Sequence, residues 1–229
     1  MEIIRRALAE GRNRLSEYES KQVLKAYGIP VTREIEVSGH QALSEAYQAI
    51  GFPLVLKGCG SRFSHKTERN LVRVDIRSPE EAVTAFDQLM REVEKESGKV
   101  LVQEMVKGRR ELVAGLTRDP QFGPCVMFGL GGIFTEILRD ISFRPAPLTQ
   151  GDAVQMIKEI KGVKILGEVR GSPPADLDQL TKLLVHLGTI GLEEEYIQEI
   201  DVNPVILDGA RPVAVDALVV LRQEFPVTE

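Results

Sequence analysis

The chain has 229 residues, of which 43% are hydrophobic and 28% charged, a composition typical of a globular protein with one large domain or two small ones. The net charge of −5 argues against an extensive nucleic-acid surface, and no apolar run approaches transmembrane length. The first six residues do not resemble a signal peptide and only two cysteines occur, so a cytoplasmic protein without a disulfide framework is expected.

Hydrophobic periodicity predicts alternating helices and strands over the first half of the chain. Capping residues mark several helix ends: Ser16 and Glu19 form a capping box, and Gly98 is predicted to close a later helix. The predicted helices cover 1–15, 16–28, 41–50 and 79–97, and the predicted strands cover 31–37, 52–57, 71–76 and 99–106.

Two side chains in this half could take part in phosphate chemistry. Lys57 ends the buried strand 52–57, where its ammonium group could neutralise a phosphate. The plainer interpretation is a lysine whose stem lies along the rim of a sheet. His65 lies in the long polar loop 58–70, and an imidazole can form a covalent phosphoryl intermediate. The plainer interpretation here is a solvated loop histidine.

A hinge is predicted at residues 104–108, because the pattern becomes strand-rich after Gly108. The chain is accordingly divided into an N-terminal helix at 1–15, a first subdomain at 16–106 and a second at 107–229. In the second subdomain, strands are predicted at 111–117, 125–128 and 133–138, helices at 149–161 and 172–190, and a short strand or turn at 163–171.

A glycine-rich turn, Phe128-Gly129-Leu130-Gly131-Gly132-Ile133, follows one of these strands. Backbone without side chains can approach a polyphosphate closely, so Gly131 and Gly132 are candidate phosphate-binding residues. A tight turn or bulge between strands is an equal alternative. The turn matches neither a dinucleotide-binding fingerprint nor a P-loop.

The stretch Glu199-Ile200-Asp201-Val202-Asn203-Pro204 is the strongest chemical signal in the sequence. In an extended strand Glu199, Asp201 and Asn203 share one face, and Ile200 and Val202 point to the other. Side-chain oxygens aligned in this way suit a hard cation such as Mg²⁺. A sheet edge with solvated acids is the alternative. Pro204 cannot donate to a ladder, so a break or bulge is expected there.

A hairpin is predicted to bring a fourth oxygen ligand to this strand. Asp208-Gly209 is a strong turn signal between two apolar runs. A two-residue loop at Gly209-Ala210 places Asn203 opposite Asp216, and a slightly shifted register would place Asp201 opposite Asp216. Cross-strand neighbours share a face, so Asp216 joins the cation site in either register.

These motifs together resemble the ATP-grasp fold, and more closely the ADP-forming acyl-CoA synthetases. The resemblance covers about residues 16 to 222. The matching motifs, in order, are Leu56-Lys57 with Ser64-His65-Lys66-Thr67, Gln103-Glu104-Met105, Glu111 to Gly115, Asp119 to Pro124, Phe128 to Ile133 with Phe143 to Pro147, and Glu199 to Pro204 with Val215-Asp216-Ala217. The implied fold class is α/β (α+β), with two ATP-grasp subdomains that hold the nucleotide between them.

The resemblance implies a specific activity and a partner. The chain length is similar to that of the separate β subunit of acetate–CoA ligase (ADP-forming). This ligase joins an acid to CoA at the expense of ATP, releasing ADP and phosphate, and the reaction is reversible. A β subunit would bind ATP or ADP with Mg²⁺. CoA would bind to an α subunit in an α₂β₂ complex, and no nucleic acid or membrane is implied.

Site residues also follow from the resemblance. His65 would carry the phosphoryl group to or from the α subunit, and Lys57 would neutralise phosphate charge. The adenine would contact Glu104, Met105 and Val106, the ribose would contact Glu111, and the phosphates would approach Gly131 and Gly132. Asn203 and Asp216 would bind the magnesium ion, with Asp201 nearby.

One departure from the family pattern favours a different kind of function. In the family, Asp-x-Gly-Gly-Val commonly follows the histidine triplet, whereas Glu68-Arg69-Asn70-Leu71-Val72 stands in this chain. A non-catalytic or regulatory nucleotide-binding module is therefore an alternative. A third interpretation is an ATP-grasp ligase that acts through an acyl phosphate and needs no loop histidine.

Overall fold

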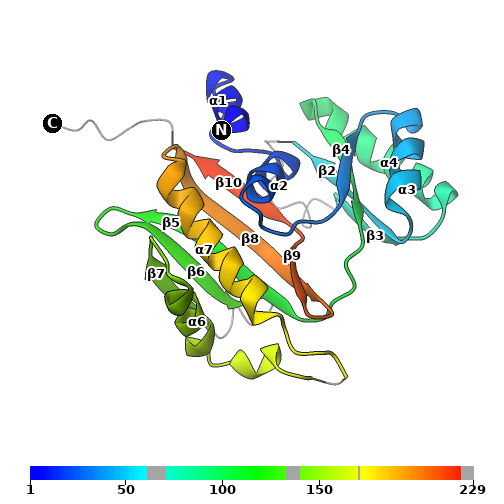
Figure 1. Ribbon diagram of the computed structural model, residues 1–229. Helices are drawn as coiled ribbons and strands as arrows, with labels where there is room; N and C mark the ends of the chain where they lie inside the picture. The colour runs from blue at the N-terminus through cyan, green and yellow to red at the C-terminus, as the bar shows by residue number, and fades with distance from the viewer. Residues whose placement is uncertain (61–70, 133–139, 170, 223–229) are drawn as a thin grey trace. The chain divides into compact units, whose positions relative to one another are not determined.

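The computed structural model describes residues 1–60, 71–132, 140–169 and 171–222 (Figure 1). The chain forms two compact units. The large unit comprises Met1–Arg14, Ser20–Val31 and Val106–Glu229, and the small unit comprises Leu15–Glu19 and Thr32–Met105. The predicted segments 1–15, 16–106 and 107–229 do not coincide with these units, because residues 1–14 and 20–31 belong with the C-terminal part of the chain.

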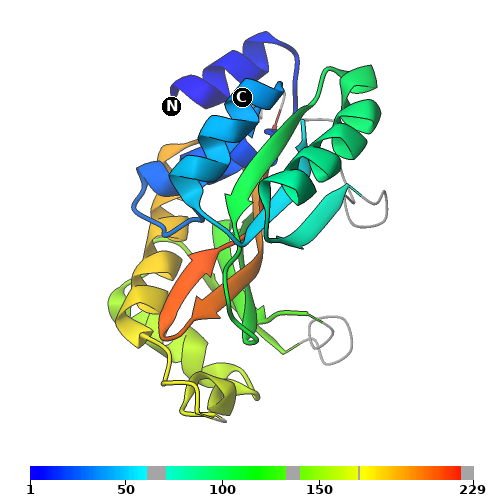
Figure 2. The same ribbon diagram turned by 90° about the vertical axis from the view of Figure 1, so that its right-hand side faces the viewer.

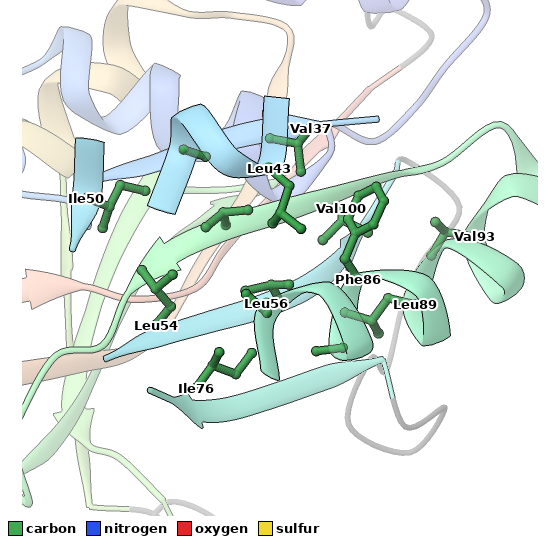
Figure 3. Packing of buried hydrophobic residues seen from close by; sticks show 14 of the residues in the cluster. Val37, Leu43, Ile50, Leu54, Leu56, Ile76, Phe86, Leu89, Val93 and Val100 are labelled. Carbon is green, nitrogen blue, oxygen red and sulfur yellow. The ribbon is translucent and has the colours of Figure 1, made fainter. Parts of the chain in front are cut away.

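The small unit is a four-stranded antiparallel sheet with two helices packed on it. The strands lie in the order β1-β4-β2-β3 and have the bounds β1 Glu34–Val37, β4 Lys99–Glu104, β2 Leu54–Cys59 and β3 Val72–Ile76. Leucine, valine and phenylalanine side chains from α3 (His40–Ile50) and α4 (Pro79–Val93) meet the strands in a buried core (Figure 3). Apolar burial of this kind is the main force that holds the unit together.

Local capping sets the ends of α4. The hydroxyl of Ser78 accepts a hydrogen bond from the Glu81 N–H, and Pro79 occupies the first turn. The helix passes into the short 3₁₀ helix η1 (Glu94–Glu96), and Ser97 takes the left-handed conformation with φ 55°. The prediction that Gly98 closes this helix is therefore wrong by one residue, although the Gly98 N–H does donate to the Val93 carbonyl.

The large unit is built on a six-stranded sheet in the order β10-β8-β5-β6-β7, with β9 also paired to β8. All of its strand pairs are antiparallel. The strands are β5 Glu111–Asp119, β6 Gly123–Leu130, β7 Ile141–Pro145, β8 Ile197–Asp208, β9 Arg211–Ala214 and β10 Ala217–Leu221. The unit also contains α1 (Glu2–Ala9) and most of α2 (Glu17–Ala26).

Helices α6 (Gln150–Glu159) and α7 (Leu177–Glu193) lie together on one face of this sheet (Figures 1 and 2). In α7, Gly188 and Gly191 permit close packing on β5 and β6, because a Cβ atom on Gly191 would lie 2.7 Å from the Leu116 Cδ1 atom. The opposite face of the sheet is the one that carries the polar side chains of β8 described below.

Two predicted elements differ from the structure. Helix α7 begins at Leu177 and not at Ser172, with Asp176 as the N-cap whose carboxylate accepts from the Gln179 N–H. The predicted strand or turn at 163–171 includes the 3₁₀ helix η2 (Val163–Leu166). The predicted strand 133–138 lies outside the described residues. Within the described ranges, no helix is both long and apolar enough to cross a membrane.

Candidate functional site

Strand β8 presents its polar residues on one face, as the sequence predicts. Ile200 and Val202 are 1% and 0% exposed, whereas Glu199 and Asn203 are exposed and Asp201 is half-buried. The alternation follows from the two-residue period of a strand, because apolar side chains that face the core fix which residues face away. Glu199, Asp201 and Asn203 therefore project from the same side of the sheet.

The hairpin after β8 has the first of the two predicted registers. Asp208 pairs with Arg211, and Val205 pairs with Ala214 across the turn. The same register continues into β10, where Ala217 pairs with Val202. Asp216 thus falls in line with Asn203. The shifted register that would set Asp201 opposite Asp216 is wrong, because Asp201 pairs with Leu218.

The predicted irregularity at Pro204 is a bulge. On the β5 side of β8, Leu112 pairs with Val205 but Ala114 pairs with Val202. Two residues of β8, Asn203 and Pro204, therefore face a single residue of β5, Val113, which lies between Leu112 and Ala114. A bulge of this kind redirects side chains locally, and here it occurs at the residue that is predicted to bind metal.

One acid on this face has a raised pKa. The pKa of Asp201 rises to about 6, mainly because the carboxyl group is partly buried and also because Glu199 and Asp216 are nearby. A carboxylate that is destabilised by burial and by like charges is stabilised when a cation binds beside it. The electrostatics of these side chains therefore fit a bound divalent cation.

The donor set suits magnesium bound together with phosphate. The described residues contain no cluster of three or more His, Cys, Asp or Glu side chains arranged to hold a metal by themselves. Magnesium in nucleotide sites commonly takes only one or two carboxylates and completes its shell with phosphate oxygens and water. The carboxylates of Asp201 and Asp216, together with the amide of Asn203, match that pattern.

Three residues predicted to contact the nucleotide are brought together in the large unit. The Gly131 N–H donates to the Glu111 carbonyl at 2.8 Å. A Cβ atom on Gly131 would lie 2.8 Å from the Glu111 carbonyl carbon, and one on Gly132 would lie 3.1 Å from Glu111 Oε2. Gly132 also has a positive φ of 65°. The glycines are thus explained by their packing against Glu111, whose side chain is exposed.

Lys57 of the small unit is buried and forms an ion pair that the sequence did not indicate. Its Nζ atom lies 2.7 Å from Glu17 Oε1, and the side chains of Lys57 and Glu17 are 7% and 0% exposed. A buried ammonium group needs such a partner. Glu17 was missed because an acid in the first turn of a helix is ordinarily explained by the helix dipole alone. The neighbouring capping box of Ser16 and Glu19 is confirmed.

The segment predicted to contact adenine is held by hydrogen bonds to residues that are far away along the chain. The two carboxylate oxygens of Glu104 accept from the backbone N–H of Arg33 at 2.8 Å and from its Nε atom at 2.7 Å. The Met105 N–H donates to the Pro53 carbonyl at 3.2 Å. Val106 is half-buried. His65, the predicted phosphoryl carrier, lies outside the described residues.

Comparison with known proteins identifies the family. The model of the ATP-grasp domain matches residues 6–221. The β subunit of acetate–CoA ligase [ADP-forming] I from Pyrococcus furiosus is 42% identical over 226 residues, which are 96% of this chain and 97% of that one.

Two solved structures of the acetyl-coenzyme A synthetase 1 from Ca. Korarchaeum cryptofilum are also similar. One, in complex with coenzyme A, Ca-AMPCP and HgCl⁺, is 41% identical with a TM-score of 0.91. The other, with coenzyme A and Mg-AMPPCP, has its phosphohistidine segment pointing towards the nucleotide binding site, and is 42% identical with a TM-score of 0.86. Each comparison covers 96% of this chain and 99% of the other. The predicted resemblance and fold class are confirmed: the chain belongs to the ATP-grasp domain family, in the group that contains the β subunits of ADP-forming acetate–CoA ligases.

Proposed function

We propose that this chain is the β subunit of an ADP-forming acyl-CoA synthetase. It binds ATP or ADP with Mg²⁺ and relays a phosphoryl group through His65 to or from the active site of a CoA-binding α subunit. The observation that carries the proposal is the polar face of β8, where Asn203 and Asp216 share one register beside Asp201. The full-length likeness to a β subunit supports the same conclusion.

Each unit contributes residues to nucleotide binding in this proposal. Asn203, Asp216 and Asp201 hold the magnesium ion, which when bound offsets the negative charge of the phosphates. Glu111 receives the ribose, and Gly131 and Gly132 leave room for the phosphates. In the small unit, Lys57 supplies a second positive charge after its ammonium group exchanges Glu17 for a phosphate oxygen. The hinge residues Glu104, Met105 and Val106 border the adenine.

His65 acts as a nucleophile on phosphorus. One imidazole nitrogen forms a bond to the γ-phosphorus of ATP, and the bond from that phosphorus to the β–γ bridging oxygen breaks, so ADP leaves. At the α subunit the phosphoryl group passes from the imidazole to the carboxylate of the acid, giving an acyl phosphate. The CoA thiolate then displaces phosphate to form the thioester. The reverse sequence makes ATP from acyl-CoA, ADP and phosphate.

The carrier role is tested by labelling the purified chain with ATP that carries ³²P in the γ-phosphate, in the presence of Mg²⁺. We expect an acid-labile, base-stable phosphoprotein from the wild type and none from His65→Ala. His40→Ala is the matched control, because His40 is an exposed histidine on α3 that pairs with Asp87 of α4. With the α subunit added, His65→Ala is expected to lose acyl-CoA-dependent ATP synthesis. Label or synthesis that survives in His65→Ala would show that His65 is not the carrier.

A second candidate function is a nucleotide-binding module without turnover. The residues 68–72 favour it, because they lack the two glycines that commonly follow the family's histidine triplet. Nucleotide binding by the wild-type chain, with no label even when the α subunit and acyl-CoA are present, would support this candidate over the synthetase. The proposed α₂β₂ assembly is checked by light scattering on the mixture of both chains.

A further inference from the structure

Lys21 is a fully buried lysine in α2. Its side chain is 0% exposed, and its Nζ atom donates a hydrogen bond to the Val215 carbonyl oxygen at 3.1 Å. Lysine is almost never fully buried, because removing an ammonium group from water costs free energy that hydrogen bonds only partly restore. An apolar residue of similar volume often stabilises a fold equally well or better. The charge at this position therefore needs an explanation other than packing.

The hydrogen bond from Lys21 is made to the short segment between β9 and β10. Val215 and Asp216 are the two residues between these strands. The Val215 N–H donates to the Pro204 carbonyl at 3.0 Å, and the Val215 carbonyl accepts from Lys21. The Val215 residue is thus fixed through both its N–H and its carbonyl group. The next residue, Asp216, is the one that stands in line with Asn203.

Ser20, the residue before Lys21, makes a second hydrogen bond to the part of the chain that contains Asp216. Ser20 is fully buried, and its hydroxyl accepts from the Val219 N–H at 3.0 Å. Two consecutive residues of α2 therefore bond the backbone at Val215 and at Val219, on either side of Asp216. Helix α2 and strand β10 are adjacent in Figure 1, in agreement with these contacts.

We infer that Lys21 is a positioning residue of the cation site, which holds the backbone before Asp216 so that the Asp216 carboxylate meets the metal beside Asn203. The inference rests on the proposed function, in which Asp216 binds magnesium. Residues that orient metal ligands without touching the metal commonly change its affinity by 10- to 100-fold when they are replaced. This role could not be predicted from sequence patterns, because Lys21 lies in a helix that is remote from β10 along the chain.

The test measures the binding of Mn²⁺, which is visible by electron paramagnetic resonance, to the full chain saturated with a non-hydrolysable ATP analogue. We expect Lys21→Met to weaken Mn²⁺ binding by about tenfold or more. The affinity for the nucleotide without metal, measured in EDTA by calorimetry, is expected to remain unchanged. Lys25→Met is the matched control, because Lys25 is an exposed lysine on the same helix; it should change neither affinity.

The outcomes separate positioning from general stability. A purely structural role would lower the thermal midpoint of Lys21→Met and leave Mn²⁺ affinity intact in the folded protein, which would overturn the inference. Ser20→Ala provides a second variant should Lys21→Met not fold, and it is expected to weaken Mn²⁺ binding several-fold; wild-type affinity in Ser20→Ala would then overturn the inference. A wild-type chain that binds nucleotide no better with Mn²⁺ than without would overturn the proposed function itself.

Discussion

The ionisation of Asp201 affects the stability of the fold. Its pKa is raised from 3.8 to about 6, first by burial and then by Glu199 and Asp216. Because the folded chain binds this proton more tightly than the unfolded chain, the stabilising contribution is complete below about pH 4. It is lost as the pH rises through 6, and the loss is about 3 kcal/mol at most.

Replacement of Asp201 by asparagine should remove this pH dependence. In EDTA, we expect the free energy of unfolding of Asp201→Asn, relative to wild type, to increase by up to about 3 kcal/mol between pH 4 and pH 7. Urea denaturation at several pH values measures it, and Asp208→Asn, an exposed aspartate on the same strand, is the control. Parallel pH profiles for wild type and Asp201→Asn would contradict this account of the acid cluster.

The polar face of β8 could be predicted from the sequence, whereas the buried charges of α2 could not. The alternation of Ile200 and Val202 with polar residues is a local pattern that burial enforces. Glu17 and Lys21 become significant only through Lys57 and Val215, which lie far away along the chain. Propensity and periodicity carry no information about such pairings, so these two charges looked like ordinary surface residues.

At the scale of elements, Arg110 holds the segment between α6 and α7 to the β8–β9 hairpin. Its guanidinium group is buried and donates to four backbone carbonyls, those of Ile165, Gly167, Pro173 and Gly209, at 2.7–3.3 Å. A planar guanidinium with five donors is suited to collecting carbonyl groups that lack partners in helices or sheets. The two predicted elements that differ from the structure both lie in this segment.

The helix boundary illustrates why this segment was mispredicted. Pro173 and Pro174 are typical of a first helical turn, and Ser172 is a plausible cap. However, the Pro173 carbonyl accepts from Arg110, and Asp176 caps the helix. The hairpin at Asp208-Gly209 was predicted in the correct register, because its turn residues and flanking alternation are adjacent in sequence.

Replacement of Arg110 by methionine should destabilise the large unit. Four carbonyls would lose charged donors in a buried setting, and we expect the free energy of unfolding to fall by about 2–4 kcal/mol. Arg109→Met, at an exposed neighbouring arginine, is expected to change it by less than about 0.5 kcal/mol. Urea denaturation of the two variants gives the comparison, and equal midpoints would show that Arg110 does not hold this segment.

At the scale of the whole molecule, each unit is built from segments that are not consecutive in the sequence. Residues 20–31 join the large unit because Val31 bridges Ala214 and the Ala214 N–H donates to Pro30. Contacts between residues that are almost a whole chain length apart leave no local sequence pattern. A division of the chain into three consecutive segments was therefore the simplest prediction. The family resemblance was easier to predict, because its motifs occur in the same order along the sequence.

Nucleotide and metal should stabilise the whole chain through linkage. A ligand that binds only the folded protein adds about 2.7 kcal/mol to the free energy of unfolding when its concentration is 100 times Kd. We expect the thermal midpoint of the wild type to rise with an ATP analogue and to rise further when Mg²⁺ is added. In Asp216→Asn the metal-dependent increment should shrink or disappear, while the increment from nucleotide alone remains.

The control for this experiment is Asp208→Asn, since Asp208 is an exposed aspartate at the hairpin turn, where it pairs with Arg211 in the ladder. It should keep both increments. A full magnesium increment in Asp216→Asn would show that the cation is held elsewhere. A magnesium increment lost in both variants would instead point to the charge of the hairpin as a whole. Loss in Asp216→Asn alone would tie the binding of the metal to the one carboxylate that the hairpin register places beside Asn203.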